Sequence, residues 1–166
     1  VVRSLLHENG SHSLDEIQSA NRITVYAVAT GEKLGLSDDN LLTLRYAAQL
    51  HNLGEIAART ELDTIEESDS NVSNGDTKLC EAHLRRILGP FEWLQDVIPI
   101  LCSLCDRSGW SGVSDMKADQ IPIEAQIIAL CKAFDSSTFA NETHSNVSEE
   151  AALARLRDEA GTVFVP

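Results

Sequence analysis

The stretch of sequence that decides the fold is residues 26–56, which read YAVATGEKLGLSDDNLLTLRYAAQLHNLGEI. Apolar residues recur along it at helical spacing, without the period of two that a strand would show. Gly35 predicts the end of a first helix. Ser37 and the two aspartates behind it predict the start of a second, because a hydroxyl and negative charge stabilise the amides of a helix N-terminus. The second helix carries apolar residues as far as His51.

Helical patterns also fill the sequence on either side. Ser13 and Glu16 form a capping box in front of an apolar stripe. Pro99 indicates a kink or a new start within a helical stretch. The further helices expected after residue 56 have approximate bounds of 77–88, 91–106, 122–134 and 148–160. The chain is therefore predicted to be all-α, a single compact domain over residues 1–166 with about six or seven helices.

Composition predicts a cytoplasmic domain. The 166 residues include 43% hydrophobic ones, enough to bury a core, and no apolar run reaches the roughly 18 residues of a spanning helix. The net charge of −13 argues against a nucleic-acid partner, which needs clustered Lys and Arg, and against an anionic membrane. Because the chain begins at Val1 without a methionine, we interpret it as a fragment of a longer protein.

The residues that carry chemistry begin with the adjacent pair His51-Asn52. An imidazole and a carboxylate on successive residues can both face a divalent ion, which acidifies a bound water and clamps a phosphate. Here an amide stands in the place of the carboxylate. A single histidine on an apolar helix is more often a core residue, so the pair alone is a weak signal.

Together with its surroundings, the pair resembles the HD-GYP branch of the HD phosphohydrolases. Residues 26–56 are similar to the segment that leads through that family's His-Asp pair. Residues 97–140, VIPILCSLCDRSGWSGVSDMKADQIPIEAQIIALCKAFDSSTFA, are similar to its second half, and residues 149–166, EEAALARLRDEAGTVFVP, to its closing helix. The resemblance covers roughly residues 19–166 and implies the family's helical fold. In that family such domains sit behind receiver or sensor domains and act on cyclic di-GMP.

The resemblance also implies a metal site, whose first half is altered in this chain. The family's early histidine falls on Ser19. The histidine of the His-Asp pair is kept as His51, whereas its aspartate is replaced by Asn52. The family's lysine three residues further on is Glu55 here.

The middle of the implied site is altered as well. The family's middle histidine falls on Cys80, with a displaced His83 as the alternative. The second histidine of its His-His pair falls on Cys105, and the glutamate that follows is Asp106.

In the last part of the implied site, the Gly-Tyr-Pro triplet reads Gly112, Val113 and Ser114, and the late metal-binding aspartate falls on Lys132. An arginine suited to a nucleotide phosphate is replaced by Asn141. Of the implied metal-ligand positions, His51 alone is intact. We expect the Lys132 ammonium to take the place of the lost cation and to pair with a carboxylate of Asp106, Asp135 or Glu55, since burying it alone would be costly.

These replacements predict a domain without a metal, a cofactor or hydrolytic activity, because hard divalent ions need several carboxylate and imidazole ligands. The expected function is a catalytically inactive HD-GYP-like module in bacterial signal transduction. Its partner would be a protein: a second copy of itself, a sensor or receiver domain, or a diguanylate cyclase domain. Two alternatives stay open, a pseudo-enzyme that binds a cyclic dinucleotide without cutting it, and a phosphodiesterase with rearranged ligands.

The four cysteines are expected to be reduced, mostly buried and free of metal, because nothing marks the chain as a small secreted protein. The alternative is a soft-metal site, since Cys80, Cys105 and His51 fall on implied ligand positions and zinc accepts thiolates and imidazole. The chain also contains two tryptophans. Trp93 is interpreted as a core residue from its helical spacing, and Trp110 as an exposed loop residue suited to contact a partner.

Overall fold

A computed structural model of the protein describes residues 14–53, 75–108, 121–139 and 147–160, and all the elements in these residues are helices. They are α2 (Leu14–Leu34), α3 (Asp38–Gln49), α5 (Gly75–Leu88), the 3-10 helix η1 (Glu92–Leu94), α6 (Val97–Ser108), α7 (Ile123–Thr138) and α8 (Glu149–Asp158). The predicted all-α fold is confirmed. None of these helices is long and apolar enough to cross a membrane.

The turn between α2 and α3 forms where the sequence predicts it. Gly35 has a φ of 76°, the left-handed conformation that ends many helices. The Ser37 hydroxyl oxygen accepts a hydrogen bond from the Asn40 amide at 3.3 Å and so begins α3. One turn before Gly35, a Cβ on Gly31 would lie 2.9 Å from a methyl carbon of Leu44. The missing side chain at Gly31 therefore allows the start of α3 to pack closely on the end of α2.

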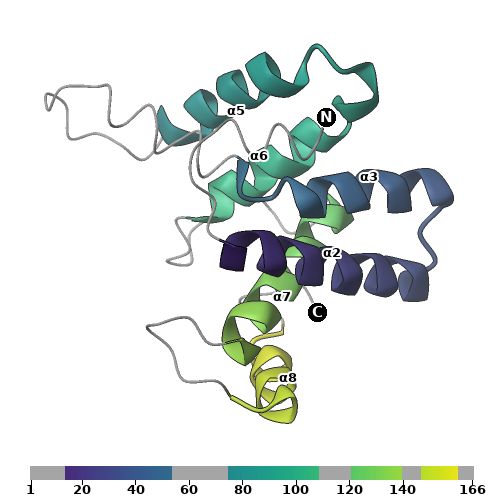
Figure 1. The fold of residues 1–166 in the computed structure, drawn as a ribbon, viewed down its shortest axis with the longest axis vertical. Helices are drawn as coiled ribbons and strands as arrows, with labels where there is room; N and C mark the ends of the chain where they lie inside the picture. The colour runs from purple at the N-terminus through teal and green to yellow at the C-terminus, as the bar shows by residue number, and fades with distance from the viewer. Residues whose placement is uncertain (1–13, 54–74, 109–120, 140–146, 161–166) are drawn as a thin grey trace, which may run out of the picture.

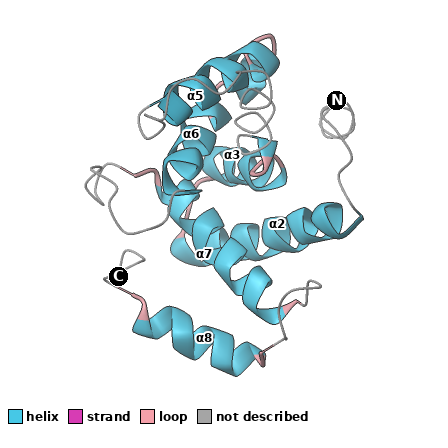
Figure 2. Cartoon of the chain, turned by 90° about the vertical axis from the view of Figure 1, so that its left-hand side faces the viewer, coloured by secondary structure: helices cyan, strands magenta, loops and turns pink. Residues whose placement is uncertain are grey.

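The helices are stacked from one end of the molecule to the other (Figures 1 and 2). α5 packs on α6 at one end, α2, α3 and α7 form the middle, and α8 packs against α7 at the other end. Because α6 also contacts α3 and α7, it connects the α5 end to the middle. The core runs through these layers, and its largest fully buried side chains include Ile23, Leu44, Leu84, Leu101 and Ile128.

The helix predicted at about 91–106 is in fact two elements. η1 ends at Leu94 and α6 begins at Val97, with Pro99 in the first turn, where its missing N–H loses no helical hydrogen bond. The break changes the direction in which Trp93 points. Its residue is 50% exposed, so the interpretation of Trp93 as a core residue is wrong. Its ring packs edge-on against Tyr46 of α3, with 5.0 Å between the ring centroids.

Candidate functional site

The structure distributes the implied site residues over four helices and the turn that follows α3. Those that it describes are Ser19 on α2, His51 and Asn52 directly after α3, Cys80 on α5, Cys105 on α6 and Lys132 on α7. Glu55 and the triplet Gly112, Val113 and Ser114 lie outside the described residues, and the side chain of Asp106, in α6, is also not described. Within the described part, contacts tie Ser19 to α7 and Cys80 to Cys105.

Ser19 belongs to a polar cluster that joins α2 to α7 around the carboxylate of Asp135. The Ser19 hydroxyl donates to Asp135 Oδ2 at 2.6 Å. The Arg22 guanidinium donates twice, from Nε to Oδ1 at 2.6 Å and from a terminal nitrogen to Oδ2 at 3.0 Å. The Asp135 side chain is only 5% exposed, so three donors compensate the burial of its charge.

The same arginine is held from a second side. The Arg22 guanidinium carbon lies 3.9 Å from the centroid of the Phe139 ring, at the end of α7. The hydrogen bond to Asp135 raises the pKa of Arg22, and burial opposes that rise. The cluster of Ser19, Arg22 and Asp135 is therefore a structural clamp between α2 and α7. The sequence does contain a signal for it, because Ser19 and Arg22 are three residues apart and lie on one face of a helix.

His51 is buried at the end of α3, and its ring orientation is fixed by the backbone. The His51 Nδ1 atom lies 2.8 Å from the Ala48 carbonyl oxygen, and the residue is 5% exposed. Because a carbonyl can only accept, we assign the proton to Nδ1, which leaves the lone pair of a neutral ring on Nε2. Asn52 follows it and is half-buried. This pair thus keeps an imidazole in an ordered position while supplying an amide in place of a carboxylate.

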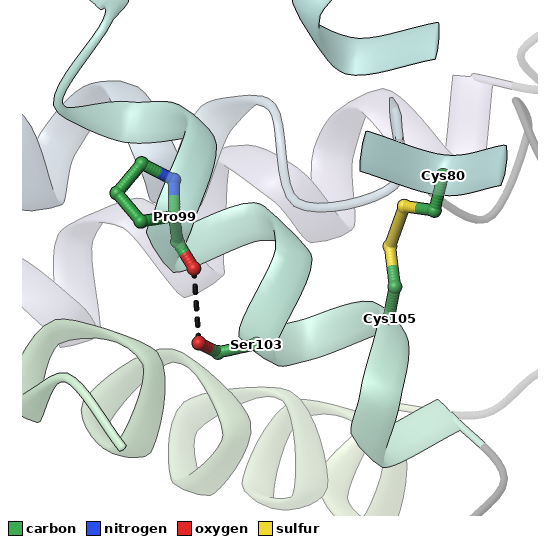
Figure 3. Close-up of a disulfide and its surroundings, with 4 residues drawn as sticks. All are labelled: Cys80, Pro99, Ser103 and Cys105. Carbon is green, nitrogen blue, oxygen red and sulfur yellow. Dashed lines mark hydrogen bonds between the residues drawn. A yellow bond between two sulfur atoms is a disulfide. The ribbon is translucent and has the colours of Figure 1, made fainter. Parts of the chain in front are cut away.

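Cys80 and Cys105 form a disulfide that links α5 to α6 (Figure 3). Their Cα atoms are 6.9 Å apart, and 25 residues separate them in sequence. The prediction that all four cysteines are reduced is therefore wrong for this pair. The general argument from protein class could not anticipate that packing α5 on α6 places these two thiols next to each other. Two implied ligand positions are bonded to each other in this structure.

The other two cysteines lie outside the disulfide. Cys131, on α7, is buried, and this burial raises the pKa of its thiol to about 11, although a hydrogen bond with Thr30 works in the opposite direction. The Cys131 thiol is therefore protonated at neutral pH. Cys102 is half-buried and lies one helical turn before Cys105 on α6. The prediction that the cysteines are mostly buried holds for Cys80 and Cys131, whereas Cys102 and Cys105 are intermediate.

Lys132 lies on α7 and is half-buried. Asp135, one of its three expected partners, is already bonded to Ser19 and Arg22. The other two expected partners are the Asp106 side chain and Glu55, which are not described. The pairing of Lys132 with a carboxylate therefore stays a prediction.

The described residues can also be compared with the requirements of a metal site. Within them, no three His, Cys, Asp or Glu side chains gather in a way that could hold a metal ion. The Ser19 hydroxyl donates a hydrogen bond to Asp135, and the sulfur atoms of Cys80 and Cys105 are bonded to each other in a disulfide. In the described part of the chain, the side chains at these positions therefore do not fit a hard divalent ion, which requires several oxygen or imidazole ligands.

Comparisons with known proteins agree with the helical architecture. A family model described as HD domain matches residues 2–165. Among curated proteins, the chain is 27% identical over 151 residues to the cyclic di-GMP phosphodiesterase response regulator RpfG of Xanthomonas campestris pv. campestris (strain 8004). That similarity covers 87% of this chain and 39% of the regulator, so the chain spans about two fifths of that relative's length. No solved structure matches significantly.

Proposed function

The chain belongs to the HD-domain family, and from this premise we propose that it is a catalytically silent regulatory module of the HD-GYP type. It would work in the cytoplasm, as part of a longer bacterial signalling protein, through a protein partner. The observation that carries the proposal is that the side chains at three implied ligand positions are bonded to other groups of the protein. Ser19 donates to Asp135, and Cys80 is bonded to Cys105.

The chemistry of phosphodiester cleavage explains why this observation matters. HD-type hydrolysis depends on metal ions that acidify water and neutralise charge on the phosphate. A serine hydroxyl engaged with a carboxylate and two sulfur atoms in a disulfide supply neither negative charge nor imidazole nitrogen. His51 alone cannot fix a hard cation, which needs about six ligands.

The relative's name supports a role in cyclic di-GMP signalling, since RpfG is a cyclic di-GMP phosphodiesterase response regulator. For this chain we propose a regulatory role in the same kind of signalling, without cutting the dinucleotide. A pseudo-enzyme that binds cyclic di-GMP is the second candidate function, and this similarity is the observation that favours it. The replacement of the implied phosphate-binding arginine by Asn141 favours the interaction module instead.

A hydrolysis assay tests the proposal directly. The purified chain is incubated with cyclic di-GMP and with a generic phosphodiester, in the presence of Mn²⁺, Fe²⁺ or Mg²⁺, beside an active phosphodiesterase as a positive control. We expect no turnover above the background without protein. Metal-dependent turnover that disappears in His51→Ala would overturn the proposal. In calorimetry, weak or undetectable binding of cyclic di-GMP is expected, whereas submicromolar affinity would favour the pseudo-enzyme.

A partner-binding role also requires a surface that a partner can use. The net charge of −13 argues against nucleic acid and anionic membranes, which leaves protein partners. Trp93, which is 50% exposed and lies against Tyr46, presents an aromatic surface of the kind enriched in protein interfaces. For self-association, we expect Trp93→Ala to weaken a dimer in light scattering. Leu153→Ala, at a 44% exposed position on α8 at the other end, is the matched control.

A further inference from the structure

The Cys80–Cys105 disulfide lies at one end of the face by which α5 packs on α6. Cys80, Leu84 and Leu88 are spaced four residues apart on α5, and all three are fully buried. They form one stripe along the helix, so the disulfide fixes its first member while apolar packing holds the other two. α5 has its main contacts with α6 (Figure 1). Among the described side chains in the first half of α5, that of Cys80 is fully buried, so this bond ties that half of the helix to α6.

The distance between the two helices limits where α5 can lie when the disulfide forms. The Cα atoms of Cys80 and Cys105 are 6.9 Å apart, just above the usual separations of about 4.4–6.8 Å and at the limit of the range that a disulfide can bridge. An outward movement of α5 by about 1 Å would take the pair beyond that range. The bond can thus form while the first half of α5 lies on α6, and once formed it keeps that half in place.

The two cysteine residues differ in their exposure to solvent. Cys80 is fully buried, whereas Cys105 is half-buried on α6. A thiol from solution can therefore approach the Cys105 sulfur more easily than the Cys80 sulfur. Attack at the Cys105 sulfur releases the sulfur of α5, which is the one that holds this helix.

We propose that Cys80 and Cys105 form a reversible thiol–disulfide switch that clamps the first half of α5 to α6. In opening, the thiolate of a small thiol such as glutathione attacks the Cys105 sulfur. A mixed disulfide forms there, the Cys80–Cys105 bond breaks, and the Cys80 thiolate leaves and takes up a proton. A second small thiol attacks the mixed disulfide and releases Cys105 as a thiol. In total, one protein disulfide and two small thiols give one protein dithiol and one small disulfide. Closing is the reverse reaction, with the small disulfide as oxidant.

This inference does not rest on the absence of hydrolysis, because its readouts are thiol content and the mobility of α5. A switch of this kind would change the surface that α5 presents to a partner, and so it suits a regulatory module. It would work equally well in a domain that retained activity.

The first test follows the thiols of the unaltered chain in glutathione buffers of increasing oxidation, quenched with acid and labelled with a maleimide after denaturation. We expect two labelled thiols in oxidising buffer and four in reducing buffer, with a reversible transition between them. Cys131→Ser and Cys102→Ser are the matched controls, and each should label one thiol fewer in both buffers while keeping the loss of two thiols on oxidation. Four labelled thiols in every buffer would overturn the proposal.

The second test measures hydrogen exchange along α5 in the same two buffers. The hydrogen-bonded amides in the first half of α5, at residues 79–81, should exchange about tenfold or more faster after reduction, while those of α2 and α8 stay unchanged. Cys105→Ser should show the fast rate in both buffers. If a disulfide forms but exchange in α5 is the same in both states, the bond is not a clamp and the proposal fails. Because the comparison uses the unaltered chain, it holds even if the serine variant folds poorly.

Discussion

Replacing Arg22 by methionine should destabilise the fold by about 2–3 kcal/mol. The Asp135 side chain is 5% exposed and the Arg22 side chain 28% exposed, so the substitution leaves a carboxylate mostly buried without its cation. Breaking a fully buried pair from one side costs about 3–5 kcal/mol. The expected loss for Arg22→Met is smaller than this, because water reaches the arginine side chain and the Ser19 hydroxyl still donates to Asp135. For a domain of this size, the melting temperature should fall by about 4–12 °C.

A double-mutant cycle separates the pair from the packing around it. Urea unfolding followed by circular dichroism gives the free energies of Arg22→Met, Asp135→Leu and the double variant. The double variant should lose less than the sum of the single losses by about 2 kcal/mol, because each single variant leaves a partner group unpaired. The matched control is Arg155→Met, which removes an ion pair with Glu159 whose arginine is 70% exposed, and this loss should stay within about 0.5 kcal/mol.

The cycle can refute the interpretation of this cluster as a clamp between α2 and α7. A coupling energy below about 0.5 kcal/mol would mean that solvent screens the Arg22–Asp135 pair as it does a surface pair. An Arg22→Met variant as stable as Arg155→Met would lead to the same conclusion.

Further outcomes follow from the cysteines and from Lys132. In oxidising buffer, Cys105→Ser should lower the free energy of unfolding by about 3.5 kcal/mol, the chain-entropy value for a loop of about 25 residues, and in reducing buffer most of this difference from the unaltered chain should disappear. The Cys131 pKa of about 11 lies above the ordinary value of 9.0, so the folded state favours the protonated thiol. This preference contributes about 2–3 kcal/mol to the free energy of unfolding below pH 9, and the contribution is lost as the pH rises to about 11. Urea unfolding of the unaltered chain should show this loss, and urea unfolding of Cys131→Ala should not. If Lys132 pairs with a carboxylate, Lys132→Met should clearly lower the melting temperature; an unchanged value would contradict the pairing. A chelator should leave the melting temperature of the unaltered chain as it is, and a chelator-induced fall would show a bound metal.

Local signals in the sequence were enough to place the α2–α3 hairpin. Gly35 and Ser37 end and begin helices through their own backbone and side-chain chemistry, which does not depend on distant residues. The error at Trp93 has a local cause too. A helical face was extended through residues 91–106, but η1 and α6 are separate elements, and a face cannot be continued across a break. The family resemblance predicts the fold because many weak motifs occur together in the order that the family shows.

The pairings in the candidate site depend on tertiary packing, which the sequence shows only indirectly. Ser19 and Asp135 meet across 116 residues, and the sequence predicted Lys132 rather than Arg22 as a partner of this carboxylate. The resemblance did place Cys80 and Cys105 in one implied site. Whether two thiols there bind a metal, stay reduced or join depends on the spacing of α5 and α6, which no local pattern reveals.

The contact between α2 and α7 also sets an order of events during synthesis of the chain. α3 follows α2 directly, so these two helices can pair as soon as both have left the ribosome. Asp135 is made 116 residues after Ser19, a delay of about 6–23 s at about 5–20 residues per second. Throughout that interval the nascent α2 exposes Ser19 and Arg22 where the finished protein has a closed helix interface. A nascent chain stalled before Asp135 should therefore remain a substrate for chaperones and proteases, however well its first helices have formed.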